Sequence, residues 1–169
     1  EILTYSDSLY PTKDFWDINQ VVDAALREVR ERNSAKDYTC QFYPLKTAPQ
    51  VYVDLKQTAG CIRNIILNSI SSLQKGLLEV TLITEPDGVS VQIKDHNKKL
   101  TDEELEPLLT PFSEASELGF GLNLALSRSI LEKQNIPLLV TATPEGGVTY
   151  AIKLPIHKED SDHEQTSGG

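Results

Sequence analysis

This chain of 169 residues has few cysteines, a deficit of basic residues and no long apolar run. Its two cysteines, Cys40 and Cys61, have no CxxC partner, and we interpret them as buried, reduced thiols. No stretch approaches the roughly 18 apolar residues of a membrane span, and no signal peptide opens the sequence. We therefore expect a soluble, cytoplasmic domain without membrane contacts of its own, and leave open a membrane anchor elsewhere in a longer protein.

Positive charge is the second shortage, because 16 Lys and Arg face 25 Asp and Glu, giving a net charge of −9. Non-specific nucleic-acid binding depends on many Lys and Arg contacts to phosphates, so the composition argues against a nucleic-acid partner. A small polyanion such as a nucleotide needs only local donors and is not excluded. The hydrophobic content of 39% suits one domain with its own core.

Apolar periodicity and turn signals predict three main helices and about six strands. Residues 1–13 are expected to be an irregular lead-in, 14–156 the folded domain, and 157–169 a disordered acidic tail. The expected helices are 18–33, with Asp17 as N-cap, 55–73, a short one over 101–109 opened by a Thr101–Glu104 capping box, and a last one ending near Asn135; the expected strands are 38–43, 51–53, 78–84, 89–94, 137–143 and 148–154. This order predicts an α+β fold, a two-layer α/β sandwich with a mixed, mainly antiparallel sheet and three main helices on one face.

The second helix carries a polar face that a solvated helix would not need. Its core stripe is Ala59, Ile62, Ile66, Ile70 and Leu73. The opposite face is short, neutral and rich in amides: Gln57, Gly60, Asn64, Asn68 and Ser71. Since Asn and Gly cost helix stability, we interpret this face as lying against something other than water. Asn64 and Asn68 are four residues apart, and their amide oxygens suit Mg²⁺; two solvated asparagines remain the alternative.

Gly119 and Gly121 run directly into the apolar pattern of the last helix. Bare backbone N–H groups at a helix N-terminus attract an anion, which favours a phosphate site there; a loop that merely turns is the alternative.

Together these segments resemble the ATP-binding catalytic domain of sensor histidine kinases, in the superfamily of gyrase, Hsp90 and MutL with its Bergerat-type fold. The likeness runs from about Ile18 to Pro155. The matching blocks are 63–73 (N box), 93–100 (G1), 108–112 (F box), 119–128 (G2) and the closing strand pair 146–155.

The resemblance implies ATP and Mg²⁺ as ligands, with residues 96–118 as the ATP lid. Asn64 and Asn68 would face Mg²⁺ and the phosphates, and Asp95 would accept a hydrogen bond from the adenine amine. Gly119 and Gly121 would let the lid close on the phosphates, and Thr149 would line the adenine pocket. The remaining nucleotide-binding positions implied by these blocks are Asn97, Lys99, Leu122 and Asn123.

The G1 block departs from the family pattern Asp-x-Gly-x-Gly, because both glycine positions are filled, by Asn97 and Lys99. Asn123 likewise replaces the third G2 glycine. The pocket is then distorted, partly self-occupied, or rebuilt with Lys98 or Lys99 as a phosphate contact. Two hypotheses follow: a catalytic domain that binds Mg-ATP, and a degenerate pseudokinase domain with weak or no ATP binding that acts through protein–protein interaction.

Hydrolysing members of the superfamily carry a glutamate where this chain has Asn64, which cannot act as a general base. Phosphoryl transfer needs mainly positioning and charge neutralisation, so a kinase remains compatible. None of the three histidines begins an acceptor helix. We therefore expect the acceptor histidine on dimerisation and phosphoacceptor helices outside this chain, a response regulator downstream, and a monomeric fragment.

Overall fold

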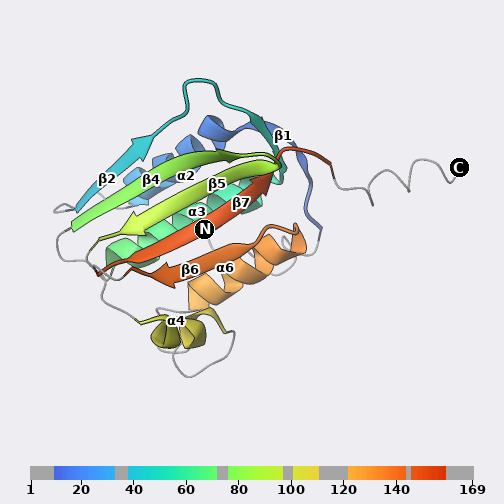
Figure 1. Cartoon of the computed structure of the whole chain (residues 1–169). Coiled ribbons are helices and arrows are strands. Elements are labelled where there is room, and N and C mark those ends of the chain that lie inside the picture. The colour runs from blue at the N-terminus through green and yellow to red at the C-terminus, as the bar shows by residue number, and fades with distance from the viewer. Residues whose placement is uncertain are drawn as a thin grey trace, which may run out of the picture.

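The computed structural model describes residues 10–32, 38–71, 76–96, 101–110, 122–143 and 146–158. Its main sheet has five strands in the order β2-β4-β5-β7-β6 (Figure 1). Strand β2 pairs with β4 in parallel, and the other three pairs are antiparallel. The mixed, mainly antiparallel sheet is thus confirmed. Its strands are β2 (Tyr38–Tyr43), β4 (Gly76–Glu85), β5 (Gly88–Asp95), β6 (Leu138–Ala142) and β7 (Val148–Pro155).

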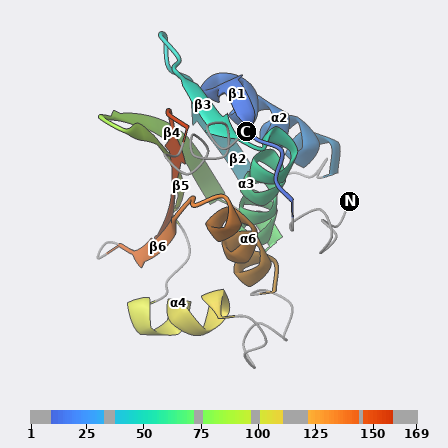
Figure 2. The ribbon, with the colours of Figure 1, turned by 90° about the vertical axis from the view of Figure 1, so that its right-hand side faces the viewer.

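Helices lie on one face of this sheet and form the second layer (Figure 2). They are α2 (Ile18–Arg32), α3 (Leu55–Ser71) and α6 (Leu122–Lys133), with the short α4 (Asp102–Leu109) below α6. The two-layer sandwich with three main helices on one face is confirmed. The Thr101 hydroxyl accepts a hydrogen bond from the backbone N–H of Glu104, as the capping box predicts.

A small second sheet was not predicted. It pairs β1 (Asp14–Asp17) with β3 (Gln50–Val53) in antiparallel register. Strand β1 has no apolar–polar alternation, and its partner lies far along the chain, so its local sequence carries no strand signal. Asp17 ends the strand and caps α2, because its carboxylate accepts a hydrogen bond from the Asn19 N–H at 2.8 Å.

The core lies between the helices and the inward-facing positions of the sheet. Along β7 buried and half-buried residues alternate strictly, as a strand with one covered face requires. The predicted stripe of α3 is buried wherever it is described: Ala59, Ile62, Ile66 and Ile70 are at most 5% exposed. Leu73 lies outside the described residues. On α2 the buried stripe consists of Ile18, Val21, Val22, Ala25, Leu26 and Val29.

The β4–β5 hairpin turns at Pro86 and Asp87, where the sequence predicts it, and Gly88 closes the turn opposite Glu85. A Cβ at Gly88 would lie 2.5 Å from the backbone oxygen of Leu154 on β7. Glycine is therefore needed here for the close approach of two strands.

Candidate functional site

Four elements meet at the C-terminal end of α3: that helix, the end of β5, the start of β7 and the beginning of α6. The direction of α6 follows from two contacts. The Cys61 thiol lies 3.7 Å from the backbone oxygen of Ser127, and Gln57 accepts a hydrogen bond from Gln134 at 3.1 Å. Since the earlier residue of α3 meets the later residue of α6, the helices are antiparallel. The N-terminus of α6 therefore points toward the end of α3 that carries Asn64 and Asn68.

Asp95, the last residue of β5, is 1% exposed and lies on the inward side of the sheet. It lies beside Tyr150 of β7, since its negative charge affects the Tyr150 phenol. Burial raises the pKa of Tyr150 above its usual 10, the nearby Ser69 hydroxyl of α3 offsets part of this, and the charge of Asp95 adds to it. Tyr150 thus lies near both Asp95 of the sheet and Ser69 of α3, the residue that follows Asn68.

Gly147 brings the chain close to Asp95 from the other side. Its φ is +113°, and a Cβ at this position would lie 2.4 Å from the backbone oxygen of Asp95. Only glycine combines this backbone conformation with this approach. No individual role was predicted for Gly147, although the Gly146–Gly147 pair before a strand was the signal available.

The expectation for Thr149 needs correction. Thr149 lies opposite Lys94, and both belong to the half-buried or exposed set that faces away from the helices. Val148, 1% exposed and paired with Asp95, is the inward residue at this point. Because side chains alternate along a strand, the register places Val148, and not Thr149, beside Asp95 on the helix-covered side.

The amide pair of α3 lies where the sequence predicts it, at this end of the helix. Asn68 is 7% exposed, and Asn64 is half-buried. The Oδ1 atom of Asn64 lies 3.3 Å from both Nε and Nη2 of Arg63. The amide of Asn64 therefore already has a cationic neighbour within the protein.

The rest of the polar face of α3 has a structural explanation. Gln57 is 2% exposed because it packs against Gln134 at the end of α6. The part of the polar face that contains Gln57 is thus covered by the end of α6. Only the half with Asn64 and Asn68 remains a candidate ligand surface; the side chain of Ser71 lies outside the described part.

Several predicted site residues cannot be placed. Asn97, Lys99, Gly119 and Gly121 lie outside the described residues. Leu122 and Asn123 are the first two residues of α6, and their side chains are likewise outside the described part.

The described residues contain no group of three or more His, Cys, Asp or Glu side chains that could hold a metal ion. Amide oxygens are available at this end of α3, and Mg²⁺ fits such donors because it keeps several waters and shares phosphate oxygens. Asn68 supplies an amide on the buried side of the site.

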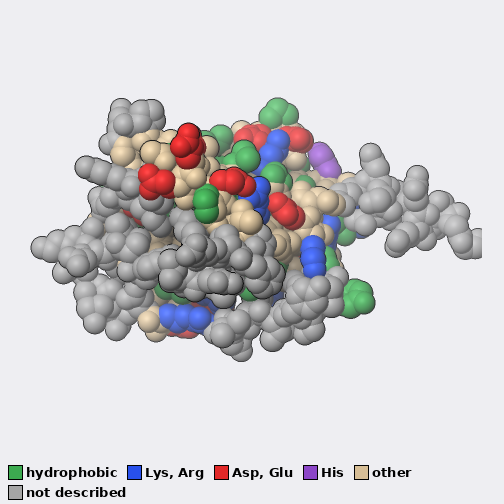
Figure 3. Space-filling model, turned by 90° about the horizontal axis from the view of Figure 1, so that it is seen from below, with side chains coloured by type: hydrophobic (Ala, Val, Ile, Leu, Met, Phe, Trp, Pro, Cys, Tyr) green, Lys and Arg blue, Asp and Glu red, His purple; other side chains and the backbone are tan. Residues whose placement is uncertain are grey.

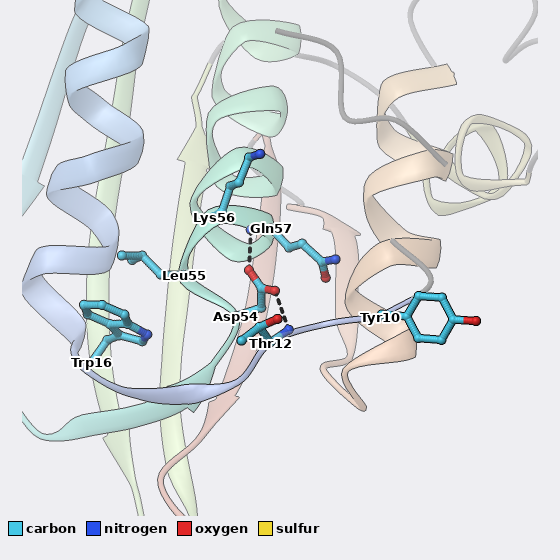
Figure 4. A pocket seen from close by; sticks show the side chains of 7 residues that line it. All are labelled: Tyr10, Thr12, Trp16, Asp54, Leu55, Lys56 and Gln57. Carbon is cyan, nitrogen blue, oxygen red and sulfur yellow. Dashed lines mark hydrogen bonds between the residues drawn. The ribbon is translucent and has the colours of Figure 1, made fainter. Parts of the chain in front are cut away.

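A cleft of about 450 Å³ lies at the opposite end of α3, away from this site (Figure 4). Asp54 lies in its wall, and its carboxylate accepts hydrogen bonds from the backbone N–H groups of Thr12 and Gln57, at 2.7 and 3.0 Å. Asp54 therefore caps α3 and holds the segment before β1. The cleft is lined by Tyr10, Thr12, Trp16, Asp54, Leu55, Lys56 and Gln57.

Helix α4 adds an acidic surface beside α6. Seen from below, acidic side chains gather on the described part of this face (Figure 3). Four of its residues are exposed carboxylates: Asp102, Glu103, Glu104 and Glu106. Asp102 ties the helix to β6 by accepting a hydrogen bond from the Ala142 N–H, and Arg128 of α6 approaches Glu106 at 3.6 Å. None of the described helices is long and apolar enough to cross a membrane.

Comparison with known proteins assigns the chain to a family. Residues 53–158, more than half of the chain, match the family model of histidine kinase-, DNA gyrase B- and HSP90-like ATPases. Sensor histidine kinase ZraS of Escherichia coli K12 is 25% identical over 142 residues, which cover 83% of this chain and 30% of ZraS. Sporulation kinase E of Bacillus subtilis is 27% identical over 112 residues, 65% of this chain and 15% of that kinase.

Solved structures agree in fold. The catalytic domain of histidine kinase ThkA in a nucleotide-free form superposes with a TM-score of 0.76 at 17% identity, covering 88% of this chain and 99% of that domain. ThkA in complex with the response regulator protein TrrA gives a TM-score of 0.72 at 17% identity, covering 86% of this chain and 42% of that one. At such identities the likeness shows the fold alone.

Proposed function

Because the chain belongs to the family of histidine kinase-, DNA gyrase B- and HSP90-like ATPases, we propose that it is the catalytic domain of a two-component sensor histidine kinase. In this proposal it binds Mg-ATP and presents the γ-phosphate to a histidine on a separate helical domain. The chain spans about a third of the length of the ZraS proteins it matches, so the acceptor helices belong to the part of such kinases not represented here.

The observation that carries the proposal is the position of Asp95. Asp95 is 1% exposed and lies at the end of β5 near the Tyr150 phenol, so a carboxylate acceptor is held inside the fold at this end of α3. Such an acceptor fits a hydrogen bond from the exocyclic amine of adenine. Guanine carries a carbonyl oxygen at the same position, and a carboxylate repels it. Asp95 thus accounts for binding and for the choice of base.

The other end of the nucleotide would lie between α3 and α6. The N–H groups of the first turn of α6 attract phosphate oxygens through hydrogen bonds and the helix dipole. The amide oxygen of Asn68 fits a place in the coordination shell of Mg²⁺, and the bound ion would neutralise phosphate charge. Gly119 and Gly121, which precede α6, stay proposed lid contacts, as do Asn97, Lys99, Leu122 and Asn123 by their positions in the sequence.

The chemistry that fits is phosphoryl transfer and not hydrolysis. Position 64 holds an amide that cannot take a proton from water. Phosphoryl transfer requires mainly that the nucleotide be held and its charge neutralised, which amides, backbone N–H groups and a divalent ion accomplish.

The alternative of a domain without nucleotide binding rests on Asn97 and Lys99, which the described part of the chain does not include. The family match and the relatives named as kinases favour the nucleotide-binding function. A response regulator as downstream partner is supported by the ThkA structure, which contains one.

The test is a calorimetric titration of the chain with ATP and with GTP at saturating Mg²⁺. We expect ATP to bind, and GTP to bind at least about tenfold more weakly, because one hydrogen bond to a charged group is replaced by repulsion. Absence of both heat and thermal stabilisation at millimolar ATP would exclude the proposal. Equal affinity for the two nucleotides would exclude Asp95 as the group that reads the base.

A further inference from the structure

The end of strand β5, which carries Asp95, is tied to β4 by a pair of side chains outside the nucleotide site. We propose that His96, paired with Glu79, is a positioning residue that holds this strand end and so keeps the Asp95 carboxylate in place for the adenine amine. The inference rests on the proposed function and deepens it, because it assigns part of the base recognition to a residue that does not touch the nucleotide.

The pair joins two neighbouring strands of the main sheet. The Nε2 atom of His96 lies 2.5 Å from the Oε1 atom of Glu79. In the register of β4 and β5, Glu79 stands opposite Lys94, and His96 is two residues beyond Lys94, so the contact is a diagonal one. An ionised carboxylate can only accept, so the Nε2–H group of the imidazole donates to Glu79.

The backbone alone holds this strand end weakly. The ladder between β4 and β5 ends with the pair of Leu78 and Asp95. Beyond it, the N–H of His96 reaches the backbone oxygen of Leu77 at 3.4 Å, which is long for a hydrogen bond of this type. The contact between His96 and Glu79 therefore supports the chain at the residue that directly follows Asp95.

Gly147 confines the same two residues from the side of β7. A Cβ at Gly147 would lie 2.4 Å from the backbone oxygen of Asp95 and 3.3 Å from the Cα of His96. The backbone of Asp95 and His96 thus has little room toward β7 and a side-chain tie toward β4. Together these contacts limit movement of the end of β5 between its two neighbouring strands.

The side chains of Asp95 and His96 lie on opposite faces of the sheet. Lys94 is exposed, Asp95 is buried and His96 is exposed again. Because side chains alternate along a strand, Asp95 faces the helices and His96 reaches the face that the helices leave open. His96 therefore acts on Asp95 through a single peptide unit and does not reach the nucleotide itself.

The strength of the tie depends on the charge of His96. A histidine side chain changes charge between about pH 5 and 8, and a charge-assisted hydrogen bond is stronger than a neutral one. Among the described strand residues at this end of the open face, the other charged side chains are Glu79 on β4 and Lys94 on β5, whereas β7 contributes the uncharged Thr149. Protonation of His96 therefore strengthens its bond to Glu79, and selectivity for adenine should be higher near the acidic end of this range.

The readout is the ratio of the affinities for ADP and for inosine diphosphate, measured by calorimetry in Mg²⁺ at about pH 6 and about pH 8. Inosine diphosphate carries a carbonyl oxygen where ADP carries the amine that Asp95 would read. Both nucleotides have the same diphosphate, so its own titration cancels in the ratio. We expect the wild-type chain to prefer ADP, and to prefer it more strongly at the lower pH.

His96→Gln should reduce the preference for ADP about two- to fivefold at the lower pH and remove its dependence on pH. The expected effect is small because the pair is partly exposed, with 42% of the His96 side chain and 27% of the Glu79 side chain accessible. Glu79→Gln should have the same effect, and the double variant should lose no more than either single variant. His96→Lys, which keeps a cation at both pH values, should retain the preference at both.

Glu85→Gln is the matched control. Glu85 lies on the same strand and face as Glu79, and its Oε2 atom is 3.2 Å from the Nζ atom of Lys153 at the other end of the hairpin. This variant should leave the preference for ADP unchanged. An equal loss in Glu85→Gln would overturn the inference, because the effect would then be one of overall charge.

A purely structural role for His96 is excluded by the same measurements. Loss of stability alone would lower the melting temperature and weaken both nucleotides together, so an ADP preference that is the same in His96→Gln and the wild type overturns the inference. In that case the proposed function stands as long as the wild-type chain binds ADP. A wild-type chain that binds neither nucleotide overturns both proposals.

Discussion

The two ends of α3 are about 25 Å apart, because an α-helix rises 1.5 Å per residue. Polar side chains are buried at both ends, but their interaction partners differ. At the N-terminal end the partners are largely backbone groups: Asp54 accepts from the N–H of Thr12 and of Gln57, and Gln134 accepts from the N–H of Asp54 at 2.9 Å. At the C-terminal end Asp95 lies at a strand terminus beside Tyr150, and the Asn64 amide is held by another side chain, Arg63.

This difference shows that burial of a polar group does not by itself identify a functional site. At a helix start or in a loop, some backbone groups have no partner within the secondary structure. Side-chain hydrogen bonds to these groups satisfy them and so stabilise the fold. Side chains that are oriented by other side chains can present a chosen atom to a ligand. Substitutions should therefore cost stability at the N-terminal end and nucleotide affinity at the C-terminal end.

Among the substitutions, the largest effect at neutral pH is expected for Gln134→Leu at the N-terminal end of α3. The change removes the acceptor of the Asp54 N–H and the donor to Gln57 Oε1, and Gln134 itself is 1% exposed. Burying such groups without this partner should lower the free energy of unfolding by roughly 2–4 kcal/mol. Urea denaturation measures it.

Lys133→Leu is the matched control, because it introduces the same side chain one residue away at an exposed position. It should change stability by less than about 0.5 kcal/mol. If Gln134→Leu weakened ADP binding instead of folding stability, the two ends of α3 would not be functionally separate.

Asp95→Asn should show the reverse pattern at the C-terminal end. The variant keeps the shape of the side chain and brings an amide donor toward the adenine amine, so ATP binding should weaken by about 1.5–3 kcal/mol. The melting temperature should hardly change. Calorimetry and a thermal denaturation scan give the two values.

Asp87→Asn controls for loss of an aspartate from the same hairpin, since Asp87 lies in the exposed turn at its other end. It should leave ATP affinity unaltered. A large fall in melting temperature for Asp95→Asn with unchanged affinity would make Asp95 a structural residue, like Asp54.

High pH tests the middle of α3, where Cys61 packs between the two ends. Burial raises the pKa of the Cys61 thiol from 9.0 to about 12. The unfolded chain releases this proton above pH 9 while the folded chain keeps it, so the free energy of unfolding should fall by about 1.4 kcal/mol per pH unit from this residue between pH 9 and 12. Tyr150, whose pKa is also raised by burial, adds to the loss above pH 10.

Cys61→Ala removes the thiol contribution. Its unfolding free energy should therefore fall less steeply with pH than that of the wild type across the same range. Parallel pH profiles of the two proteins would show that the folded protein does not hold the pKa of this thiol above its unfolded value.

The helices and hairpins could be predicted from the sequence because their signals are local. The stripe of α2 and the turn at Pro86–Asp87 each occupy a few neighbouring residues. Strand β1 was missed because only its pairing with β3 defines it. The family blocks directed attention to Asp95 and Asn68, whose burial at one end of the fold agrees with the roles proposed for them.

The errors concern which way a side chain faces. Thr149 was expected in the pocket, and only the register with β5 shows that Val148 is the inward residue. Gln57 belonged to the polar face of α3, and only the position of α6 shows that a helix covers it. The link from Arg63 to Asn64 joins adjacent residues, yet nothing in their spacing indicates that the arginine is buried.

The smallest effect is expected where α4 meets α6. Glu106→Gln removes the contact between Glu106 and Arg128, an ion pair at 3.6 Å whose acidic partner is 70% exposed, while Arg128 keeps Glu132 at 3.2 Å. Exposed pairs of this kind contribute little, so stability should fall by no more than about 0.5 kcal/mol, and by nothing measurable at 1 M salt. Glu103→Gln, another exposed carboxylate of α4, is the control. The helix α6 begins at the end of α3 where the nucleotide is proposed to bind. If Glu106→Gln alone lowered the affinity for ADP more than threefold, α4 would influence nucleotide binding through α6.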